Sequence, residues 1–395
     1  MNKLPLQGVR VLDISTVLAA PLTCSLLGEL GAEVIKVESP ITGDPARSFP
    51  PLVRGTAAAW EQYGRGKRSI AVDLHEQAGI DVVRELVRGC EVVVTNFRTP
   101  TLERFGLEFD DLAALQPRLV MLHLTAFGRT GPYSNRPGFA RVVEAFSGLT
   151  HRTGSPDGPP MFSGYPIADG VGGMYGAFAI LAALRQRDLT NEAQLVDLGL
   201  YEPLLRMMED LIPNYTQTGV VANRVGNDNP AVSPNGLFRT ADDRWLVLPA
   251  STEAMWRRLL TVMDRPDLAQ FDSMDSRVRN RSVIDEAVGQ FVAEHELDDI
   301  LAMLHDAGLA AGPVNTAQDI LADEQIRARG SILNVHDRHG QPTSVLAPAG
   351  RFSGFEHADL AAAPAVGEHT DDILAKLAGL NQAQIEALRN LGVIA

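Results

Sequence analysis

Short apolar runs alternate with amphipathic stretches along residues 9–200. The first run, 9–15 (VRVLDIS), predicts a buried strand, and a helix from about Pro21 to Leu30 separates it from a second strand at 32–39. This strand–helix–strand order predicts a parallel sheet with a right-handed crossover. The alternation continues with strands expected at 69–74, 90–97, 119–127 and 193–200 and helices at 76–89, 101–115 and 169–187. Near-continuous apolar strands between amphipathic helices predict a doubly wound α/β domain.

The pattern then changes, first in a long loop and again near residue 220. Residues 128–168 are rich in Gly, Pro and Ser and predict an ordered loop with one helix near 140–148. A turn-forming stretch at 223–236 predicts a linker before a hairpin at 237–250 and further helices, the first beginning at Ser251. We expect three parts: the N-terminal part of a large domain at 1–220, a smaller α+β domain at 222–315, and a C-terminal part at 317–395.

Composition narrows the range of partners. The chain carries 35 basic and 49 acidic residues, a net charge of −14, which argues against nucleic acid and against an anionic membrane surface as partners. The two cysteines, Cys24 and Cys90, form no disulfide framework and no zinc-type spacing, so no metal is expected. The N-terminus lacks an apolar signal core, and the longest apolar run, 176–184, is too short to cross a bilayer. A soluble cytoplasmic protein is expected.

Common catalytic motifs do not account for this chain. The sequence GRGKRS (64–69) lacks the hydroxyl residue and spacing of a phosphate-binding loop, and no GxSxG elbow occurs. The run GVGGMYG (170–176) has GxGxxxG spacing, which favours close helix packing over nucleotide binding. Asp169 directly precedes this run. It can be a helix N-cap, or it can be a carboxylate nucleophile that the glycines leave open to a substrate carbonyl.

Basic residues gather at loops and strand ends of the predicted α/β domain: Arg65, Lys67, Arg68, Arg98, Arg104 and Arg136. Any one of them can be a solvated surface residue. Ligands of open α/β sheets, however, bind outside the carboxyl ends of the strands. The segment NFR (96–98) is such an end, so these cations together can hold phosphates.

Several motifs occur in an order that resembles the family III CoA-transferases. This group contains formyl-CoA:oxalate, carnitine and related dicarboxylate CoA-transferases, as well as the α-methylacyl-CoA racemases. The motifs are GVRVLDISTVLAAP (8–21), LGAEVIKVESPITGDPAR (30–47), GKRSIAVDL (66–74), VVVTNFRTPTLERFGL (92–107), GRTGPYSNRPGF (128–139), DGVGGMYGAFAILAAL (169–184) and VGEHTDDILAKLAGL (366–380). The resemblance implies an interlocked, ring-like homodimer whose Rossmann-like large domain is built from both chain ends.

The resemblance also implies a chemistry and its residues. Asp169 aligns with the family's catalytic aspartate, which forms an aspartyl–acyl anhydride and then an aspartyl-CoA thioester without a metal. The substrates are then an acyl-CoA and a carboxylic acid. The positions that correspond to coenzyme A contacts are Leu18, Ala19, Val72, Asp73, Leu74, His75, Asn96, Phe97, Arg98, Arg104, Arg136, Pro137, Gly138 and Phe139.

The chain departs from some members of the family at the acyl-binding positions. Oxalate-handling members usually carry Gln at the position of Leu18, Tyr-Glu at Phe139-Ala140 and a four-glycine loop, and the racemases carry His-Asp at Phe139-Ala140. We expect neither activity. Arg141 is either a surface residue or a partner for a second substrate carboxylate, which would favour a C4–C5 dicarboxylic acid such as succinate. Alternatives are a transferase for a monocarboxylic or aromatic acid, and a non-catalytic acyl-CoA-binding partner subunit.

Overall fold

The computed structural model describes residues 3–395; residues 1 and 2, where the predicted large domain begins, lie outside the described part. The chain forms two compact units. Unit 1 contains the residues up to Leu149 together with Phe162–Gly219 and Ala328–Ala395. Unit 2 contains Thr150–Met161 and Val220–Arg327.

These units divide the chain differently from the predicted boundaries at two places. The segment Thr150–Met161 belongs to unit 2, where Arg224 donates hydrogen bonds to the carbonyl oxygens of His151 (3.0 Å) and Gly158 (3.2 Å). Residues 317–327 also belong to unit 2, and there Arg244 and Asp319 form an ion pair at 3.4 Å. Contacts between segments far apart in the sequence set both boundaries, and a pattern read along the chain does not contain them.

A six-stranded parallel sheet forms the centre of unit 1, in the order β5-β2-β1-β6-β7-β8. Its strands are β1 (Arg10–Asp13), β2 (Glu33–Glu38), β5 (Lys67–Ala71), β6 (Val92–Thr95), β7 (Val120–Thr125) and β8 (Gln194–Gly199). Counted in chain order among these six strands, the spatial order is 3-2-1-4-5-6, that of a Rossmann fold. The predicted α/β class and parallel sheet are confirmed. The strand order reverses between β1 and β6, and ligands of such sheets bind at this position.

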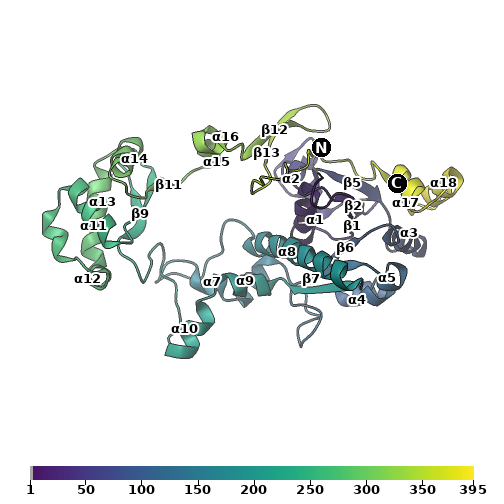
Figure 1. The fold of residues 1–395 in the computed structure, drawn as a ribbon, viewed down its shortest axis with the longest axis horizontal. Coiled ribbons are helices and arrows are strands. Elements are labelled where there is room, and N and C mark those ends of the chain that lie inside the picture. Colours follow the sequence, from purple (N-terminus) through teal and green to yellow (C-terminus); the bar gives the residue numbers. More distant parts are fainter. Residues whose placement is uncertain (1–2) are drawn as a thin grey trace. The chain divides into compact units, whose positions relative to one another are not determined.

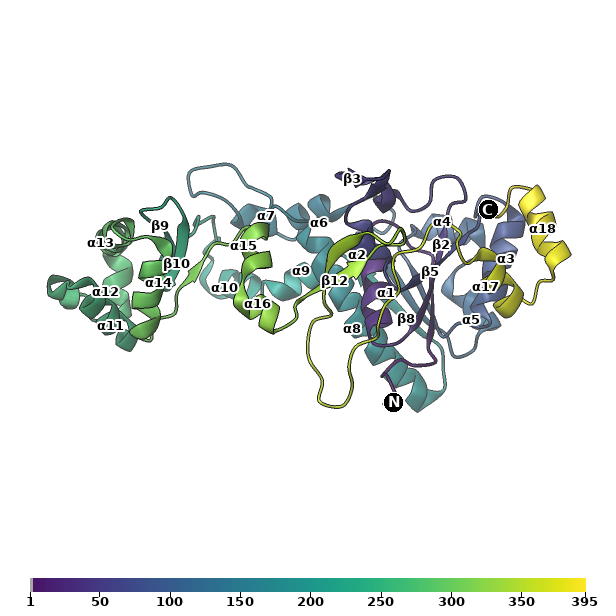
Figure 2. The same ribbon diagram turned by 90° about the horizontal axis from the view of Figure 1, so that it is seen from above.

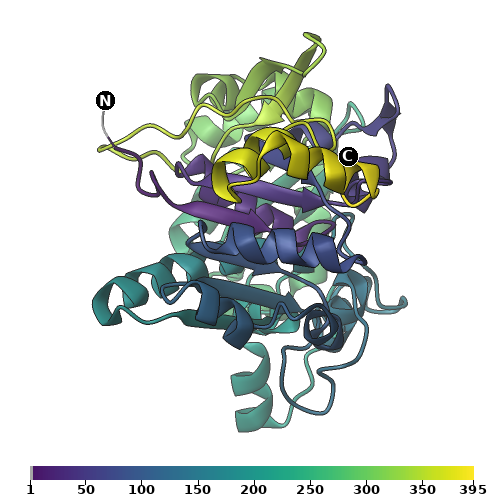
Figure 3. The ribbon, with the colours of Figure 1, turned by 90° about the vertical axis from the view of Figure 1, so that its right-hand side faces the viewer.

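Helices cover both faces of this sheet (Figures 1 and 3). One face packs against α1 (Ala19–Glu29), α6 (Ala140–Phe146), α8 (Ile167–Thr190) and α9 (Tyr201–Met207). The other face packs against α3 (Gln77–Val87), α4 (Thr99–Phe105), α5 (Phe109–Leu115), α17 (Thr370–Leu377) and α18 (Gln382–Asn390). Successive strand residues point to opposite faces, so Val11 joins the first core and Leu12 the second. Both faces are therefore apolar, as the continuous runs predict.

The glycine run at the start of α8 allows this helix to pack closely on α1. A Cβ atom at Gly173 would lie 2.7 Å from the carbonyl oxygen of Ala19, and one at Gly176 would lie 2.5 Å from Oγ1 of Thr23. The hydroxyl of Thr23 also donates a hydrogen bond to the carbonyl oxygen of Gly173 (2.9 Å). By length and composition alone α8 could cross a membrane, but half of its apolar window is buried inside the protein. It is a core helix of unit 1.

The C-terminal segment returns to the free edge of the sheet at β5. The backbone N–H of Ala71 donates a hydrogen bond to Oγ1 of Thr370 (3.1 Å), and Val72 forms a bridge with Ile394. Figure 2 shows α17 and α18 beside α3. Unit 1 also contains elements that the sequence pattern did not predict: η1 (Pro45–Ser48), β3 (Leu52–Val53), β4 (Thr56–Ala57), α2 (Trp60–Gly64), α10 (Leu211–Thr218) and β13 (Pro342–Leu346), which pairs with β12 (Ile332–His336). Another such helix, α7 (Leu149–Arg152), begins at the last residue of the first segment of unit 1 and continues into unit 2.

Unit 2 combines a small antiparallel sheet with helices. The predicted hairpin is formed by β9 (Asn235–Arg239) and β10 (Trp245–Pro249), and β11 (Gly312–Pro313) pairs with β10. The helices are α11 (Glu253–Met263), η2 (Pro266–Gln270), α12 (Met274–Arg279), α13 (Arg281–Ala293), α14 (Leu297–Asp306), α15 (Ala317–Ala322) and α16 (Glu324–Ala328). Thr252 rather than Ser251 caps α11, because its side chain accepts from the N–H of Met255.

Candidate active site

A cavity of about 200 Å³ lies in unit 1 at the carboxyl ends of β1, β6 and β7. It therefore coincides with the point where the strand order reverses. The residues that line it are Thr16, Val17, Leu18, Ala19, Asn96, Arg98, Leu124, Thr125, Ala126, Ser134, Arg136, Pro137, Gly138, Phe139, Asp169 and Leu200. Predicted site residues from four separate segments of the sequence thus meet around one space.

Asp169 lies in the first turn of α8 and lines this cavity. The helix begins at Ile167 with Pro166 in the N-cap position, so the interpretation of Asp169 as an N-cap is wrong. The side chain is half-buried. Burial, and after it the negative charge of Glu144, raise the pKa of Asp169 to about 6. Its carboxylate is more basic than an ordinary aspartate, and basicity favours nucleophilic attack.

Two tyrosines that the sequence analysis missed interact electrostatically with Asp169. Tyr63 belongs to α2, and Tyr165 lies in the segment before α8, where its ring packs over the backbone of Gly170. Burial raises the pKa of Tyr63, and the charge of Asp169 raises it further. Burial, Tyr63 and Asp169 together raise the pKa of Tyr165. No motif marks either tyrosine, because α2 and the segment before α8 lie about a hundred residues apart in the sequence.

Eight of the positions that the resemblance relates to coenzyme A line the cavity. They are Leu18, Ala19, Asn96, Arg98, Arg136, Pro137, Gly138 and Phe139. Arg98 donates a short hydrogen bond to the carbonyl oxygen of Asn135, and the guanidinium of Arg136 stacks over Tyr133, 3.6 Å from the ring centre. Both cations are therefore held at the cavity by neighbouring groups, where a phosphate could reach them.

The remaining coenzyme A positions lie outside this cavity. Val72 is buried directly after β5, and the side chain of Asp73 accepts a hydrogen bond from the backbone N–H of the exposed His75 (2.9 Å), which follows Leu74. His75 and Phe97 each contact the ring of Phe105 edge-on, and Arg104 lies over the same ring. The structure thus brings His75, Phe97 and Arg104 together around the ring of Phe105. None of these three residues lines the cavity.

The two predicted substrate contacts, Ala140 and Arg141, do not line the cavity. Ala140 is buried at the start of α6. Arg141 forms an ion pair with Glu144 at 3.2 Å and donates a hydrogen bond to the carbonyl oxygen of Ser163 (2.8 Å), and its guanidinium lies 4.7 Å from the ring centre of Phe162. Its charge is therefore engaged within the protein.

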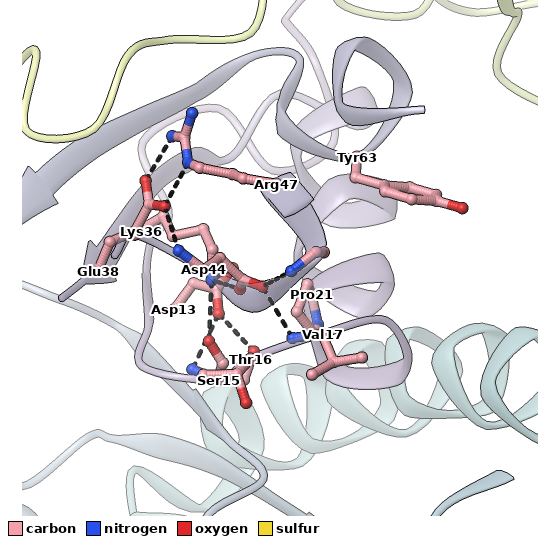
Figure 4. A network of polar contacts seen from close by, with 12 residues as sticks. Asp13, Ser15, Thr16, Val17, Pro21, Lys36, Glu38, Asp44, Arg47 and Tyr63 are labelled. Atoms are coloured by element: carbon pink, nitrogen blue, oxygen red, sulfur yellow. Dashed lines mark hydrogen bonds and ion pairs between the residues drawn. The ribbon is translucent and has the colours of Figure 1, made fainter. Parts of the chain in front are cut away.

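A network of buried charges lies beside the loop between β1 and α1 (Figure 4). Nζ of Lys67 contacts Asp13 at 3.0 Å, and Nζ of Lys36 contacts Asp44 at 2.9 Å. Burial alone would raise the pKa of Asp13, but Lys36 and Lys67 lower it to about 2. Burial would lower the pKa of Lys36, yet Asp13 and Asp44 raise it above its usual range. Asp13 and Lys36 are therefore charged at neutral pH.

This network fixes the loop that carries Val17 and Leu18. Asp44 accepts hydrogen bonds from the backbone N–H groups of Val17 (3.1 Å) and Ala46 (2.8 Å). Asn96, at the end of β6, accepts from the N–H of Thr16 (2.9 Å) and donates to its carbonyl oxygen (2.7 Å). The loop at the rim of the cavity is thus held in place by hydrogen bonds to Asp44 and to Asn96.

A larger cavity, of about 690 Å³, lies elsewhere in unit 1 and contains none of the predicted site residues. Two of the arginines that line it already have partners, since Arg47 pairs with Glu38 at 2.7 Å and Arg54 pairs with Asp337 at 2.9 Å. We place the candidate site at the smaller cavity because the carboxylate with a raised pKa, two phosphate-binding candidates and the strand-order reversal all meet there.

A Rossmann-type sheet with a basic carboxylate and arginines at its switch point defines a site for an anionic, nucleotide-like ligand beside a potential nucleophile. Comparison with known proteins shows to which family the chain belongs. Residues 6–370 match the model of CoA-transferase family III, and the chain belongs to this family. It is accordingly a CoA-transferase, whose substrates are CoA thioesters and carboxylic acids.

Individual relatives cover nearly the whole chain. The β subunit of succinyl-CoA–L-malate CoA-transferase from Chloroflexus aurantiacus is 36% identical over 99% of this chain and 98% of its own length. Succinyl-CoA–D-citramalate CoA-transferase from the same organism is also 36% identical, with the same coverage. The crystal structure of a CAIB/BAIF family protein from Brucella suis superposes with a TM-score of 0.86 at 33% identity, covering 95% of this chain and all of that one.

Proposed function

We propose that this enzyme moves coenzyme A from an acyl-CoA, of the succinyl-CoA type, to a C4–C5 dicarboxylic acid through covalent intermediates on Asp169. The observation that carries the proposal is the position of Asp169. It is a half-buried carboxylate with a pKa raised to about 6, at the wall of the cavity that Arg98 and Arg136 also line. The names of the two Chloroflexus relatives support the substrate class, since both contain succinyl-CoA and a four- or five-carbon dicarboxylic acid.

The first half of the reaction activates the enzyme. A carboxylate oxygen of Asp169 attacks the thioester carbonyl carbon, the carbon–sulfur bond breaks, and a mixed anhydride and CoA thiolate form. The thiolate then attacks the aspartyl carbonyl carbon and expels the first acid as its carboxylate. Asp169 is left as an aspartyl-CoA thioester.

The second half repeats these steps with the acceptor acid. Its carboxylate attacks the aspartyl carbonyl carbon and expels the thiolate, which gives a second mixed anhydride. The thiolate attacks the acceptor's carbonyl carbon, releasing the new acyl-CoA and the Asp169 carboxylate. The anhydride keeps the activation of the original thioester, so the exchange needs no further energy source, but water must be kept away from it.

Positioning of coenzyme A follows from the cations at the cavity. Arg98 and Arg136 present guanidinium groups, which bind phosphate in a bidentate manner. Leu18 and Ala19 line the same cavity at the start of α1, where backbone N–H groups favour negative charge. In this proposal the phosphates of coenzyme A bind near these groups and the thioester reaches Asp169. Arg141 contacts Glu144 and the carbonyl oxygen of Ser163 through Nη1 and stays a candidate partner for the second carboxylate.

The wider organisation of the enzyme is part of the same proposal. We infer an interlocked homodimer in the cytoplasm, with the two chain ends sharing one large domain. The buried, unpaired Cys24 and Cys90 suit a reducing compartment. Light scattering of the purified protein tests the dimer, and a monomer would contradict it. An unequal pair is the alternative that a relative's description as a β subunit favours, and co-purification from native cells distinguishes it.

Trapping tests the covalent route directly. The enzyme is incubated with succinyl-CoA and then with hydroxylamine, which converts an aspartyl anhydride or thioester into a hydroxamate, and the peptides are analysed by mass spectrometry. We expect the modification at Asp169, and its loss in Asp169→Asn. Turnover without any hydroxamate at Asp169 would contradict the mechanism.

A panel of donors and acceptors tests the substrate class. Succinyl-CoA is offered with malate, citramalate and glutarate, and with monocarboxylic and aromatic acids, while product CoA esters are measured by mass spectrometry. We expect the dicarboxylic acids to be preferred. Preference for a monocarboxylic or aromatic acid would favour the alternative transferase, and an absence of all exchange would favour a non-catalytic binding subunit. Exchange of an α-proton is not expected, since Phe139 and Ala140 supply no base.

A further inference from the structure

Glu144 connects two helices at the candidate nucleophile. It lies on α6 and is 1% exposed. Its Oε1 accepts a hydrogen bond from the backbone N–H of Ala168 (3.3 Å), the residue directly before Asp169. Its Oε2 pairs with Nη1 of Arg141 at 3.2 Å, and Arg141 also donates to the carbonyl oxygen of Ser163 (2.8 Å). One buried carboxylate therefore contacts the first turn of α8 on one side and a cation on the other.

The contact with Ala168 does not by itself require a charged residue. The first N–H groups of a helix have no partner within the helix, and any neutral oxygen acceptor satisfies one of them. A glutamine at position 144 would offer such an oxygen in nearly the same shape. A buried carboxylate costs more to desolvate than an amide, and here it is kept with its own arginine. The hydrogen bond to Ala168 therefore does not explain why residue 144 is a charged glutamate.

The charged and titratable neighbours of Asp169 identify a reason for this charge. The charge of Asp169 raises the pKa of Tyr63 on α2 and of Tyr165 in the segment before α8. Arg98 and Arg136 line the same cavity. Glu144 on α6 acts on Asp169 as a like charge. We propose that Glu144 is a positioning residue for Asp169, which places a buried negative charge beside the first turn of α8 and holds the start of this helix through the N–H of Ala168.

In this arrangement Arg141 weakens the electrostatic effect of Glu144 on Asp169. Its guanidinium pairs with the Glu144 oxygen that does not contact Ala168, and its second bond to Ser163 anchors it to the segment that leads into α8. It partly neutralises the glutamate and fixes its rotamer. The inference rests on the proposed nucleophilic role of Asp169 and adds the origin of its reactivity.

The test is the pH profile of kcat/KM in Glu144→Gln, which keeps the acceptor for Ala168 and removes the charge. We expect the acid limb of the profile, which reports ionisation of the free enzyme's nucleophile, to move to lower pH by up to about one unit. The rate on the high-pH plateau should fall about two- to threefold, since a less basic carboxylate is a weaker nucleophile. The exposed Glu192 gives the matched control, and Glu192→Gln should leave the profile in place.

A second variant gives a shift of opposite sign. Arg141→Met removes the cation beside Glu144, so the acid limb should move to higher pH. If both variants lose rate but neither shifts its acid limb, Glu144 and Arg141 have only a structural role and the inference is overturned. The inference is also overturned if the acid limbs of the two variants shift in the same direction. If Glu144→Gln does not fold, the shift in Arg141→Met decides the question alone.

Hydroxylamine trapping separates this inference from the proposed function. If the wild-type enzyme forms no hydroxamate at Asp169, the proposed function fails first. If the adduct forms in the wild type and in Glu144→Gln, but the acid limb is unmoved, the nucleophile stands and only the role of Glu144 is rejected.

Discussion

The backbone N–H of Val17 donates a hydrogen bond of 3.1 Å to the buried carboxylate of Asp44. Val17 has a φ of 73°, in the left-handed region that a β-branched residue rarely adopts. The conformation persists because the surroundings dictate it. Asp44 accepts a hydrogen bond from the N–H of Val17 and pairs with Lys36. The side chain of Asn96 forms hydrogen bonds with both the N–H and the carbonyl oxygen of the preceding residue, Thr16. Strained backbone of this kind gathers at functional sites, and here it lines the wall of the cavity that contains Asp169.

Replacing Asp44 should therefore affect both stability and substrate binding. Asp44→Asn keeps an oxygen for the N–H of Val17 but leaves the buried Lys36 with less negative charge. We expect the free energy of unfolding, measured with urea, to fall by about 3 kcal/mol. The KM for acyl-CoA should rise more than kcat falls, because the loop that borders the cavity loosens. Asp157→Asn, at an exposed aspartate in unit 2, is the control and should change neither quantity. Unchanged KM in a destabilised Asp44→Asn would show that the loop does not depend on Asp44.

Asp169 should lower the stability of the enzyme at neutral pH. Its folded-state pKa of about 6 lies above the ordinary value of 3.8, so the folded state favours the protonated form. The resulting cost is absent below about pH 4 and complete above about pH 6. After allowance for the half-exposed side chain, Asp169→Asn should be more stable than wild type by about 1–2 kcal/mol at pH 8. The gain should vanish near pH 4. Urea denaturation at both pH values measures it, and an equal gain at both would contradict the raised pKa.

The sheet could be predicted from the sequence because a local run of apolar residues marks each of its strands. Continuous apolar runs such as 90–97 and 119–127 can be buried only between two helical layers, and both became strands of the parallel sheet. Terminal positions were less certain: the strand expected at 69–74 is β5, Lys67–Ala71, and the stretch 101–115 divides into two helices at Gly106, which has a φ of 58°. Short elements such as β3 and β4 carry no periodicity and were missed.

The candidate site was predicted only where motifs mark it. Asp169, Arg98 and Arg136 came from a motif or a strand end, and the structure places all three at one cavity. Tyr63 carries no such signal, because its position near Asp169 depends on the packing of α2. The role of Arg141 depends on a partner three residues away, Glu144, whose burial a sequence pattern alone does not show.

The arginines at the cavity should contribute to binding of the nucleotide part of coenzyme A. Arg98→Met and Arg136→Met should each raise the KM for acyl-CoA about ten- to a hundredfold, the range for losing one charge-assisted hydrogen bond, with a much smaller change in kcat. A substrate with the same acyl group on pantetheine lacks the nucleotide phosphates, and with it both variants should match the wild type. Arg185→Met, on the exposed face of α8, is the control. Equal losses with both thioesters would place the phosphates elsewhere.

Close packing of α8 on α1 should limit substitution at Gly173. A Cβ there would lie 2.7 Å from the carbonyl oxygen of Ala19, a backbone atom that cannot rotate away. Gly173→Ala should therefore lower the free energy of unfolding by about 1–3 kcal/mol. Because Ala19 begins α1 and lines the cavity, the same displacement should raise the KM for acyl-CoA. Gly164→Ala is the matched control, since a Cβ at Gly164 has no neighbour within 4 Å. Urea denaturation and steady-state kinetics measure both effects, and a Gly173→Ala enzyme as stable as the wild type would mean that the two helices are not in close contact at this glycine.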